Sequence, residues 1–284
     1  MRNVSGIVWS RDSRFLAVTP YGDWDRAAVV DLDANQLHVV PDRVGVPWCG
    51  GVAGLLPGPL IVQQCTLAGG AGSEVRFLAI DGTARISWTF PGVVSLLDIS
   101  PNGQMLALDF WGPAGRAPNR KQHDIAIVNI SDRVELRRWS LPEAVSYGGV
   151  FAGSGLAFCT EPRLESVRSK HEWVCREIAT GSETLRRDLP LGVGGVRAVA
   201  NRLIVGHSRI TLLPFPLFGT DHIVTRTDQE MWDFQSGKEI ASWRIDWQKV
   251  LPKADAASES AVSADGNLVA VGGSGILRVY RISP

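Results

Sequence analysis

The four cysteines are the residues whose type and spacing most directly suggest chemistry. Cys49 and Cys65 are equally distant from Pro57, so a simple hairpin centred on that Leu-Pro-Gly-Pro turn places them opposite each other. Cys159 and Cys175 flank one loop in the same way. The two pairs predict either disulfides, which form in oxidising compartments, or buried free thiols. Both alternatives stay open, because directly opposed cysteines strain the disulfide geometry.

The histidines give little indication of catalysis or metal binding. They lie at positions 38, 123, 171, 207 and 222, and none pairs at the spacing of metal ligands. His207, Asp221 and His222 share one loop region, but isolated polar loop residues are the common case. The chain has no Gly-x-Ser-x-Gly elbow, no Gly-x-x-x-x-Gly-Lys loop and no Gly-x-Gly-x-x-Gly motif. We therefore predict no catalytic residue, metal ligand or cofactor, and favour a non-catalytic protein over an enzyme.

A repeated phrase indicates which elements must position any site. It reads Ser-Arg-Asp-Ser-Arg-Phe-Leu-Ala at 10–17, Ser-Pro-Asn-Gly-Gln-Met-Leu-Ala at 100–107 and Ser-Ala-Asp-Gly-Asn-Leu-Val-Ala at 263–270. Each copy predicts the end of one strand, a tight polar turn and the start of an apolar strand. The first two copies lie 90 residues apart, twice a 45-residue period. That period, with strand-like segments only, is typical of a β-propeller.

Period-2 alternation along almost the whole chain predicts an all-β fold. The first unit predicts four strands, at 4–10, 15–19, 27–32 and 36–40. Turns rich in Gly, Asn and Asp, which tolerate positive φ, recur near 12, 57, 102, 153, 200 and 265. They predict a single propeller domain over 1–284 with six four-stranded blades, and seven blades is the alternative. The last stretch, 260–284, supplies three strands, so residues 1–3 must add an outer strand or the edge stays open.

Two segments resemble the WD-repeat family: residues 232–243, Trp-Asp-Phe-Gln-Ser-Gly-Lys-Glu-Ile-Ala-Ser-Trp, and the phrase at 100–107. The resemblance extends over the whole chain in its period and is strong in a few repeats. The family's Gly-His dipeptide before each blade is missing, and its Asp-His-Ser-Trp network cannot be traced. The resemblance implies a non-catalytic platform for protein partners.

Charge and hydropathy exclude some partners. Basic and acidic residues balance at 29 each, which argues against a general binder of nucleic acid or of membrane surfaces. No apolar run reaches the roughly 18 residues of a membrane span. No apolar signal segment follows Met1. We therefore expect a cytoplasmic protein if Met1 is the native start, and a secreted or periplasmic one if a leader was removed.

The predicted connections differ between the two faces of the propeller. Connections between strands one and two, and between three and four, are tight and share one face. The other face has long connections, at 21–26, 68–74, 111–123, 161–171, about 208–222, and 246–258. Long loops on a rigid scaffold usually carry binding residues, whereas the alternative is drift in loop length without a function.

Tryptophans and cations are the candidates for partner binding on this long-loop face. Exposed tryptophan is a frequent interface anchor, although loop tryptophans also fill gaps between blades. Two neighbouring loops are locally basic and suggest an acidic partner. The candidates are Trp24, Trp48, Trp111, Arg116, Arg120, Lys121, Arg163, Arg168 and Trp247. The remaining tryptophans considered, Trp88, Trp139 and Trp243, fall in fourth strands and are expected to pack between blades.

The sequence thus favours a binding platform that holds a protein or peptide partner on the long-loop face. The alternative is a propeller enzyme or small-ligand binder whose site lies at the mouth of the central channel on the same face. Carboxylate, histidine or asparagine side chains converging on the propeller axis would distinguish the second from the first.

Overall fold

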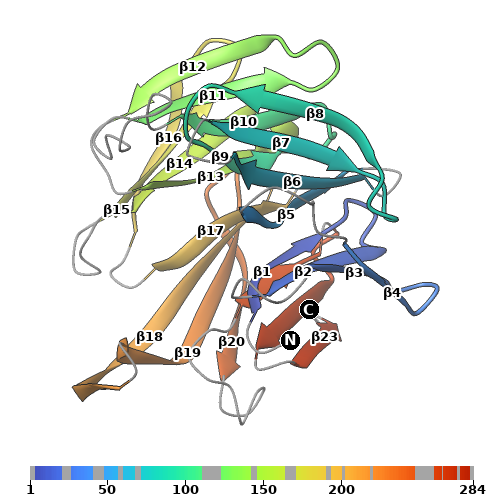
Figure 1. The fold of residues 1–284 in the computed structure, drawn as a ribbon. Helices are drawn as coiled ribbons and strands as arrows, with labels where there is room; N and C mark the ends of the chain where they lie inside the picture. Colours follow the sequence, from blue (N-terminus) through green and yellow to red (C-terminus); the bar gives the residue numbers. More distant parts are fainter. Residues whose placement is uncertain are drawn as a thin grey trace.

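Antiparallel strands form six sheets in the part of the chain that the structure describes (Figure 1). A computed structural model describes residues 4–20, 27–40, 48–56, 60–67, 72–110, 123–141, 146–163, 171–189, 193–199, 202–217, 220–246, 259–263, 265–273 and 276–281. Within these ranges the one helical element is a 3₁₀ turn, Gly153–Gly155. None of these residues belongs to a helix long and apolar enough to span a membrane.

The first five sheets are four-stranded blades in which each strand pairs with the next along the chain. The first two blades are β1 (Val4–Trp9), β2 (Phe15–Pro20), β3 (Ala28–Asp31) and β4 (Gln36–Val39), then β5 (Trp48–Leu56), β6 (Leu60–Thr66), β7 (Ser73–Leu78) and β8 (Ala84–Phe90). The third blade is β9 (Val94–Ile99), β10 (Met105–Phe110), β11 (His123–Asn129) and β12 (Glu135–Leu141). These bounds confirm the predicted strands of the first unit to within two residues.

The remaining blades follow the same order. The fourth is β13 (Ser146–Ala152), β14 (Ala157–Arg163), β15 (His171–Glu177) and β16 (Glu183–Leu189), and the fifth is β17 (Val193–Val199), β18 (Arg202–Leu217), β19 (Thr220–Asp233) and β20 (Glu239–Asp246). The sixth has three strands in the described residues, β21 (Glu259–Val262), β22 (Leu268–Gly273) and β23 (Ile276–Arg281). The prediction of six blades, the last with three strands, is confirmed; residues 1–3 lie outside the described ranges.

The repeated phrase forms a hydrogen-bonded turn between the first and second strands of a blade. The Ser10 hydroxyl donates to Asp12 Oδ1 at 2.5 Å and accepts from the Phe15 amide at 2.8 Å. The same two bonds recur at Ser100, with Asn102 and Met105, and at Ser263, with Asp265 and Leu268. The fourth residue of each turn has positive φ, as predicted: 59° at Ser13, 71° at Gly103 and 76° at Gly266. A buried hydroxyl therefore satisfies the backbone where each second strand begins.

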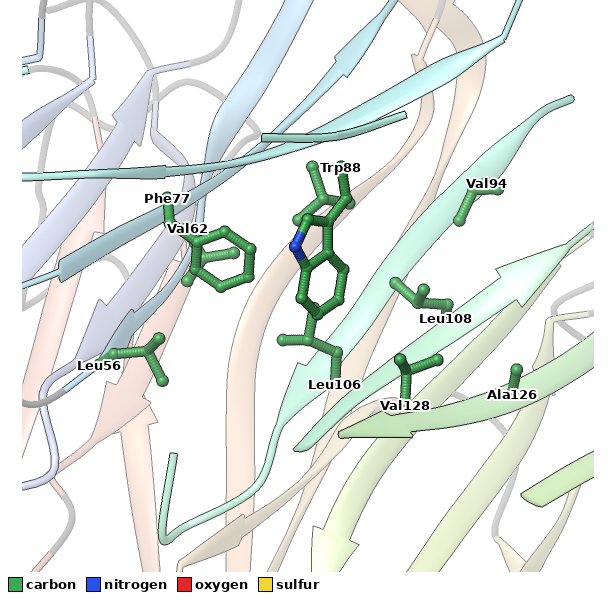
Figure 2. Close-up of a cluster of buried hydrophobic side chains, with 10 residues drawn as sticks. Leu56, Val62, Phe77, Trp88, Val94, Leu106, Leu108, Ala126 and Val128 are labelled. Carbon is green, nitrogen blue, oxygen red and sulfur yellow. The ribbon is translucent and has the colours of Figure 1, made fainter. Parts of the chain in front are cut away.

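Apolar clusters between neighbouring blades form the core. The described residues contain six clusters, one for each pair of neighbouring blades around the ring. Figure 2 shows the cluster between the second and third blades, with Leu56, Val62, Phe77 and Trp88 on one side and Val94, Leu106, Leu108, Ala126 and Val128 on the other. Burial of this apolar surface holds each blade against the next.

The ring closes between the first and last blades. Ile7 and Leu16 of the first blade pack with Ala261 and Ala270 of the sixth. The indole of Trp9 also donates a hydrogen bond to the Ala261 carbonyl at 3.1 Å. Residues from the two ends of the chain therefore meet in one interface, as the predicted closure requires.

Tryptophans of the fourth strands fill the gaps between blades, as predicted. Trp88 on β8 packs against the third blade, and Trp139 on β12 packs against the fourth. Trp243 on β20 packs against Val262 and Val269 of the sixth. These side chains contribute to the packing between blades.

Candidate functional site

The strand bounds show part of the predicted difference between the two faces. On the tight face, short turns join the strands, and side chains cap them. Asn129 Oδ1, for example, accepts from the Ser131 amide at 2.8 Å. On the opposite face the connections between second and third strands are longer in four blades, and the longest separates Phe110 at the end of β10 from His123 at the start of β11. The connections from β8 to β9, β12 to β13 and β16 to β17 on this face are short. We call this second face the long-loop face.

Most residues predicted to bind a partner lie outside the described ranges: Trp24, Trp111, Arg116, Arg120, Lys121, Arg168 and Trp247. Two lie on described backbone. Trp48 is the first residue of β5, opposite Thr66, and Arg163 is the last residue of β14, opposite Ser146. Both positions are at the strand ends that meet the long-loop face. The role of all nine in partner binding stays a prediction.

The segment 208–222 is not the loop that the sequence predicted. It continues β18 and β19 as an antiparallel hairpin, paired from Arg202↔Asp233 to Leu212↔His222 and again at Leu217↔Thr220. The prediction failed because Pro214 and Pro216 lack the amide hydrogen of a regular strand. The structure places both prolines between Leu212 and Leu217, where the register is interrupted.

This hairpin extends the fifth blade well beyond the ring (Figure 1). β18 has 16 residues, whereas the corresponding β10 has 6. At about 3.3 Å per residue, the difference corresponds to roughly 30 Å of additional strand. The hairpin joins the second strand of its blade to the third, so it leaves from the long-loop face. We refer to residues 207–227 as the blade-five hairpin.

A buried acid–histidine pair lies at the base of the predicted basic loop. Asp109 on β10 and His123 on β11 are 2% and 0% exposed, and His123 Nδ1 is 3.0 Å from Asp109 Oδ1 and 2.9 Å from Oδ2. They flank residues 111–122, which carry three of the predicted cations. His123 was expected in that loop, but it begins a strand and is buried. The pair joins β10 and β11 where these two strands meet the long-loop face.

Polar side chains also tie the second blade to the third at the same face. Gln64 donates to the Val94 carbonyl at 2.5 Å and accepts from the Leu96 amide at 2.7 Å. The Ser73 hydroxyl accepts from the Val94 amide and donates to the Gly92 carbonyl, both at 3.0 Å. No local motif could have identified these contacts, because they join residues 19 to 32 positions apart.

Both cysteine pairs lie across neighbouring strands, as predicted. Cys159 on β14 is opposite Cys175 on β15, and the two form a disulfide. Cys65 is also disulfide-bonded, and the register of β5 and β6 places Cys49 directly opposite it. No described cysteine is free. For Cys159 and Cys175 the disulfide is therefore the correct alternative.

The backbone register separates the loop histidines. His207 is opposite Asp228, whereas His222 is opposite Leu212, five positions further along β18. That separation is about 16 Å along the strand, so these two histidines do not share a ligand position. Among the described residues there is no group of three His, Cys, Asp or Glu arranged to hold a metal ion.

The tight face carries an ion pair with a strong electrostatic effect. Arg14 binds Asp31 through two parallel hydrogen bonds, Nη2–Oδ2 at 2.7 Å and Nε–Oδ1 at 3.1 Å. The Ala34 amide also donates to Asp31 Oδ1 at 3.1 Å. The arginine, and then the backbone amide, lower the pKa of Asp31 to about 2. This pair stabilises the end of β3 and its turn.

Comparison with known proteins supports the fold class. No model of a protein family matches the chain, and no curated protein matches its sequence. Among solved structures, it is similar to a putative TolB from Agrobacterium tumefaciens, with a TM-score of 0.60 and 15% identity over 86% of this chain and 81% of that one. It is also similar to the hydrazine synthase of Kuenenia stuttgartiensis, with a TM-score of 0.53 and 15% identity over 97% and 75%. At this identity the similarity shows the fold alone: the protein is a β-propeller.

Proposed function

We propose that this protein is a non-catalytic binding platform that holds a protein or peptide partner on its long-loop face. The ring supplies a rigid support, because apolar clusters join every pair of neighbouring blades. Turns of near-minimum length on the tight face offer little surface for recognition. An interface of ordinary size buries about 800 Å² on each partner, so the long-loop face suits this role better.

The blade-five hairpin is the observation that carries the proposal. It extends β18 and β19 from the long-loop face as a paired antiparallel hairpin (Figure 1). The sequence of its outer part is rich in apolar residues, with Ile210, Leu212, Leu213, Phe215 and Leu217. Apolar residues on such a projection are typical of an interaction site.

The predicted loop residues complete this surface. Arg116, Arg120 and Lys121 suggest an acidic partner, whose association they would accelerate, while Trp111 and Trp24 would slow its dissociation. The resemblance to WD repeats also points to a protein partner. The alternative is an enzyme or small-ligand binder at the channel mouth, and carboxylate, histidine or asparagine side chains converging on the propeller axis would support it.

The test uses peptides selected from a display library against the folded protein, with their affinities measured by fluorescence polarisation. One variant replaces residues 209–226 by Asn-Gly, which joins the paired residues Ser208 and Thr227 through a two-residue turn. A second variant is Trp111→Ala. We expect each to weaken binding about tenfold or more, which corresponds to about 1.4 kcal/mol.

The matched control is Asn102→Gly on the tight face, which should leave affinity unchanged. All variants are compared by thermal unfolding, so that a loss of binding is separated from a loss of folding. If the hairpin and Trp111 variants bind normally while the folded Asn102→Gly variant does not, the assignment of the binding face is wrong.

A further inference from the structure

The sixth blade ends in a strand that occupies the third position of a blade. β23 pairs with β22 on one side, and within the described residues no strand pairs with its outer edge. In each of the other five blades a fourth strand covers this edge. Within the described part of the chain, β23 is therefore an edge strand at a position that is internal in the other blades.

The exposure of Val279 shows the consequence. Val279 is opposite Ala270 and is 39% exposed. The residues at the same register position in the other blades are 0–3% exposed, namely Val29, Phe77, Ile127, Cys175 and Met231. An apolar side chain at this position is buried wherever a fourth strand is present.

The other blades also show which residue a strand paired with the outer edge of β23 should carry. In three of them the fourth strand places a tryptophan opposite the residue that corresponds to Leu277: Trp88 opposite Val75, Trp139 opposite Ile125, and Trp243 opposite Gln229. Each of these tryptophans packs against the next blade. Leu277 packs at the interface with the first blade, where no described fourth-strand residue lies beside it.

The positive charge of β23 indicates which charge a strand paired with its outer edge should carry. Arg278 and Arg281 are exposed, and the strand has no acidic residue. Fourth strands of this protein begin with a glutamate in three blades, Glu135, Glu183 and Glu239. In the third blade, Glu135 is opposite Val128, the counterpart of Tyr280. A glutamate at that place on a strand added to β23 would lie on the same face as Arg278, diagonally across from it.

We propose that the outer edge of β23 is a strand-addition site for an acidic, extended segment of a partner protein. The segment would run antiparallel to β23, place an aromatic residue opposite Leu277, and complete the sixth blade. Backbone hydrogen bonds would supply affinity, and the aromatic side chain specificity. The site lies on the rim of the ring and is independent of the long-loop face.

The probe is a fluorescent peptide with the sequence of residues 239–246, Glu-Ile-Ala-Ser-Trp-Arg-Ile-Asp, which forms a fourth strand in the fifth blade. We expect saturable binding by fluorescence polarisation. Replacing the peptide's tryptophan by alanine should weaken binding about thirtyfold. A peptide with N-methyl groups on alternate backbone amides keeps its side chains but cannot pair with a strand, and it should not bind.

Two variants of the protein test the location. Val279→Asp and Arg278→Glu should each weaken binding about tenfold; Arg278→Glu changes an exposed side chain and is expected to fold normally. The matched control is Leu136→Asp, which alters an apolar residue, 43% exposed, on the outer strand of the third blade. It should bind the peptide like the unaltered protein.

Several results would overturn the proposal. One is equal binding of the N-methylated peptide, and another is an equal loss of affinity in Leu136→Asp. A third is binding only after removal of residues 1–3, which would mean that the chain covers its own edge. A fourth is a β23-dependent dimer in light scattering, which would identify a second copy as the occupant.

Discussion

Loss of the buried Asp109–His123 pair should destabilise the protein strongly, and the effects of replacing the two residues should not be additive. Asp109→Ala leaves the imidazole of His123 in a fully buried position without the carboxylate that lies 2.9 Å from its Nδ1. Breaking a buried pair by removing one partner costs about 3–5 kcal/mol of unfolding free energy. Domains have unfolding free energies of about 5–15 kcal/mol, so the variant should remain folded unless the protein lies at the low end of that range.

The coupling between the two side chains separates their pairing from simple loss of packing. A buried hydrogen bond to a charged group contributes about 1.5–3 kcal/mol. Asp109→Ala, His123→Ala and the double variant form a mutant cycle, measured by urea unfolding at pH 7 and 25 °C. We expect the double variant to lose about 1.5–3 kcal/mol less than the sum of the single variants.

The control is Asp124→Ala on the same strand. Asp124 bonds Ser140 at 2.7 Å, and this bond is exposed to solvent, so its removal should cost no more than about 1 kcal/mol. Additivity of the cycle to within about 0.5 kcal/mol would refute the reasoning, because it would show that the two side chains contribute independently.

Three further predictions concern the scaffold. Ser100→Ala removes the acceptor of the Met105 amide and should lower the unfolding free energy by about 1–3 kcal/mol, whereas retention of full stability would show that water replaces the hydroxyl. Because Arg14 lowers the pKa of Asp31, the Asp31 carboxylate stabilises the fold at pH values above its ordinary pKa and loses this effect as the pH falls from about 4 to about 2. Arg14→Gln should therefore make the unfolding free energy less dependent on pH between about 4 and about 2. An unchanged pH dependence would show that Arg14 is not the cause of the lowered pKa. Replacing Cys159 and Cys175 by serine should cost about 3 kcal/mol, and thiol titration of the denatured, unreduced protein should detect neither cysteine.

Much of the scaffold could be predicted because its signals are local. The Ser10, Ser100 and Ser263 turns depend on bonds between residues two to five positions apart, so the same phrase yields the same turn wherever it occurs. Alternation with period 2 likewise reports strands from neighbouring residues alone. The cross-strand position of Cys65 followed from symmetry about a turn.

The blade-five hairpin and the binding contacts were decided by longer-range structure. Pro214 and Pro216 argue locally against a strand, but the structure accommodates them at an interruption in the register. The Gln64 bonds depend on the backbone of a neighbouring blade, which is about 30 residues away in the chain. Residue types alone do not indicate such partners.

The sequence by itself thus determined that this chain folds into a six-bladed propeller with one elaborated face, because turns and strand periodicity are properties of short segments. The tertiary structure alone decided which polar side chains meet at the long-loop face and which strand edge lacks a neighbour. Those outcomes depend on how six sheets pack into a closed ring. In this ring Asp109 contacts His123, and among the described residues no fourth strand lies beside Val279. Packing across blades joins residues that the chain itself keeps apart.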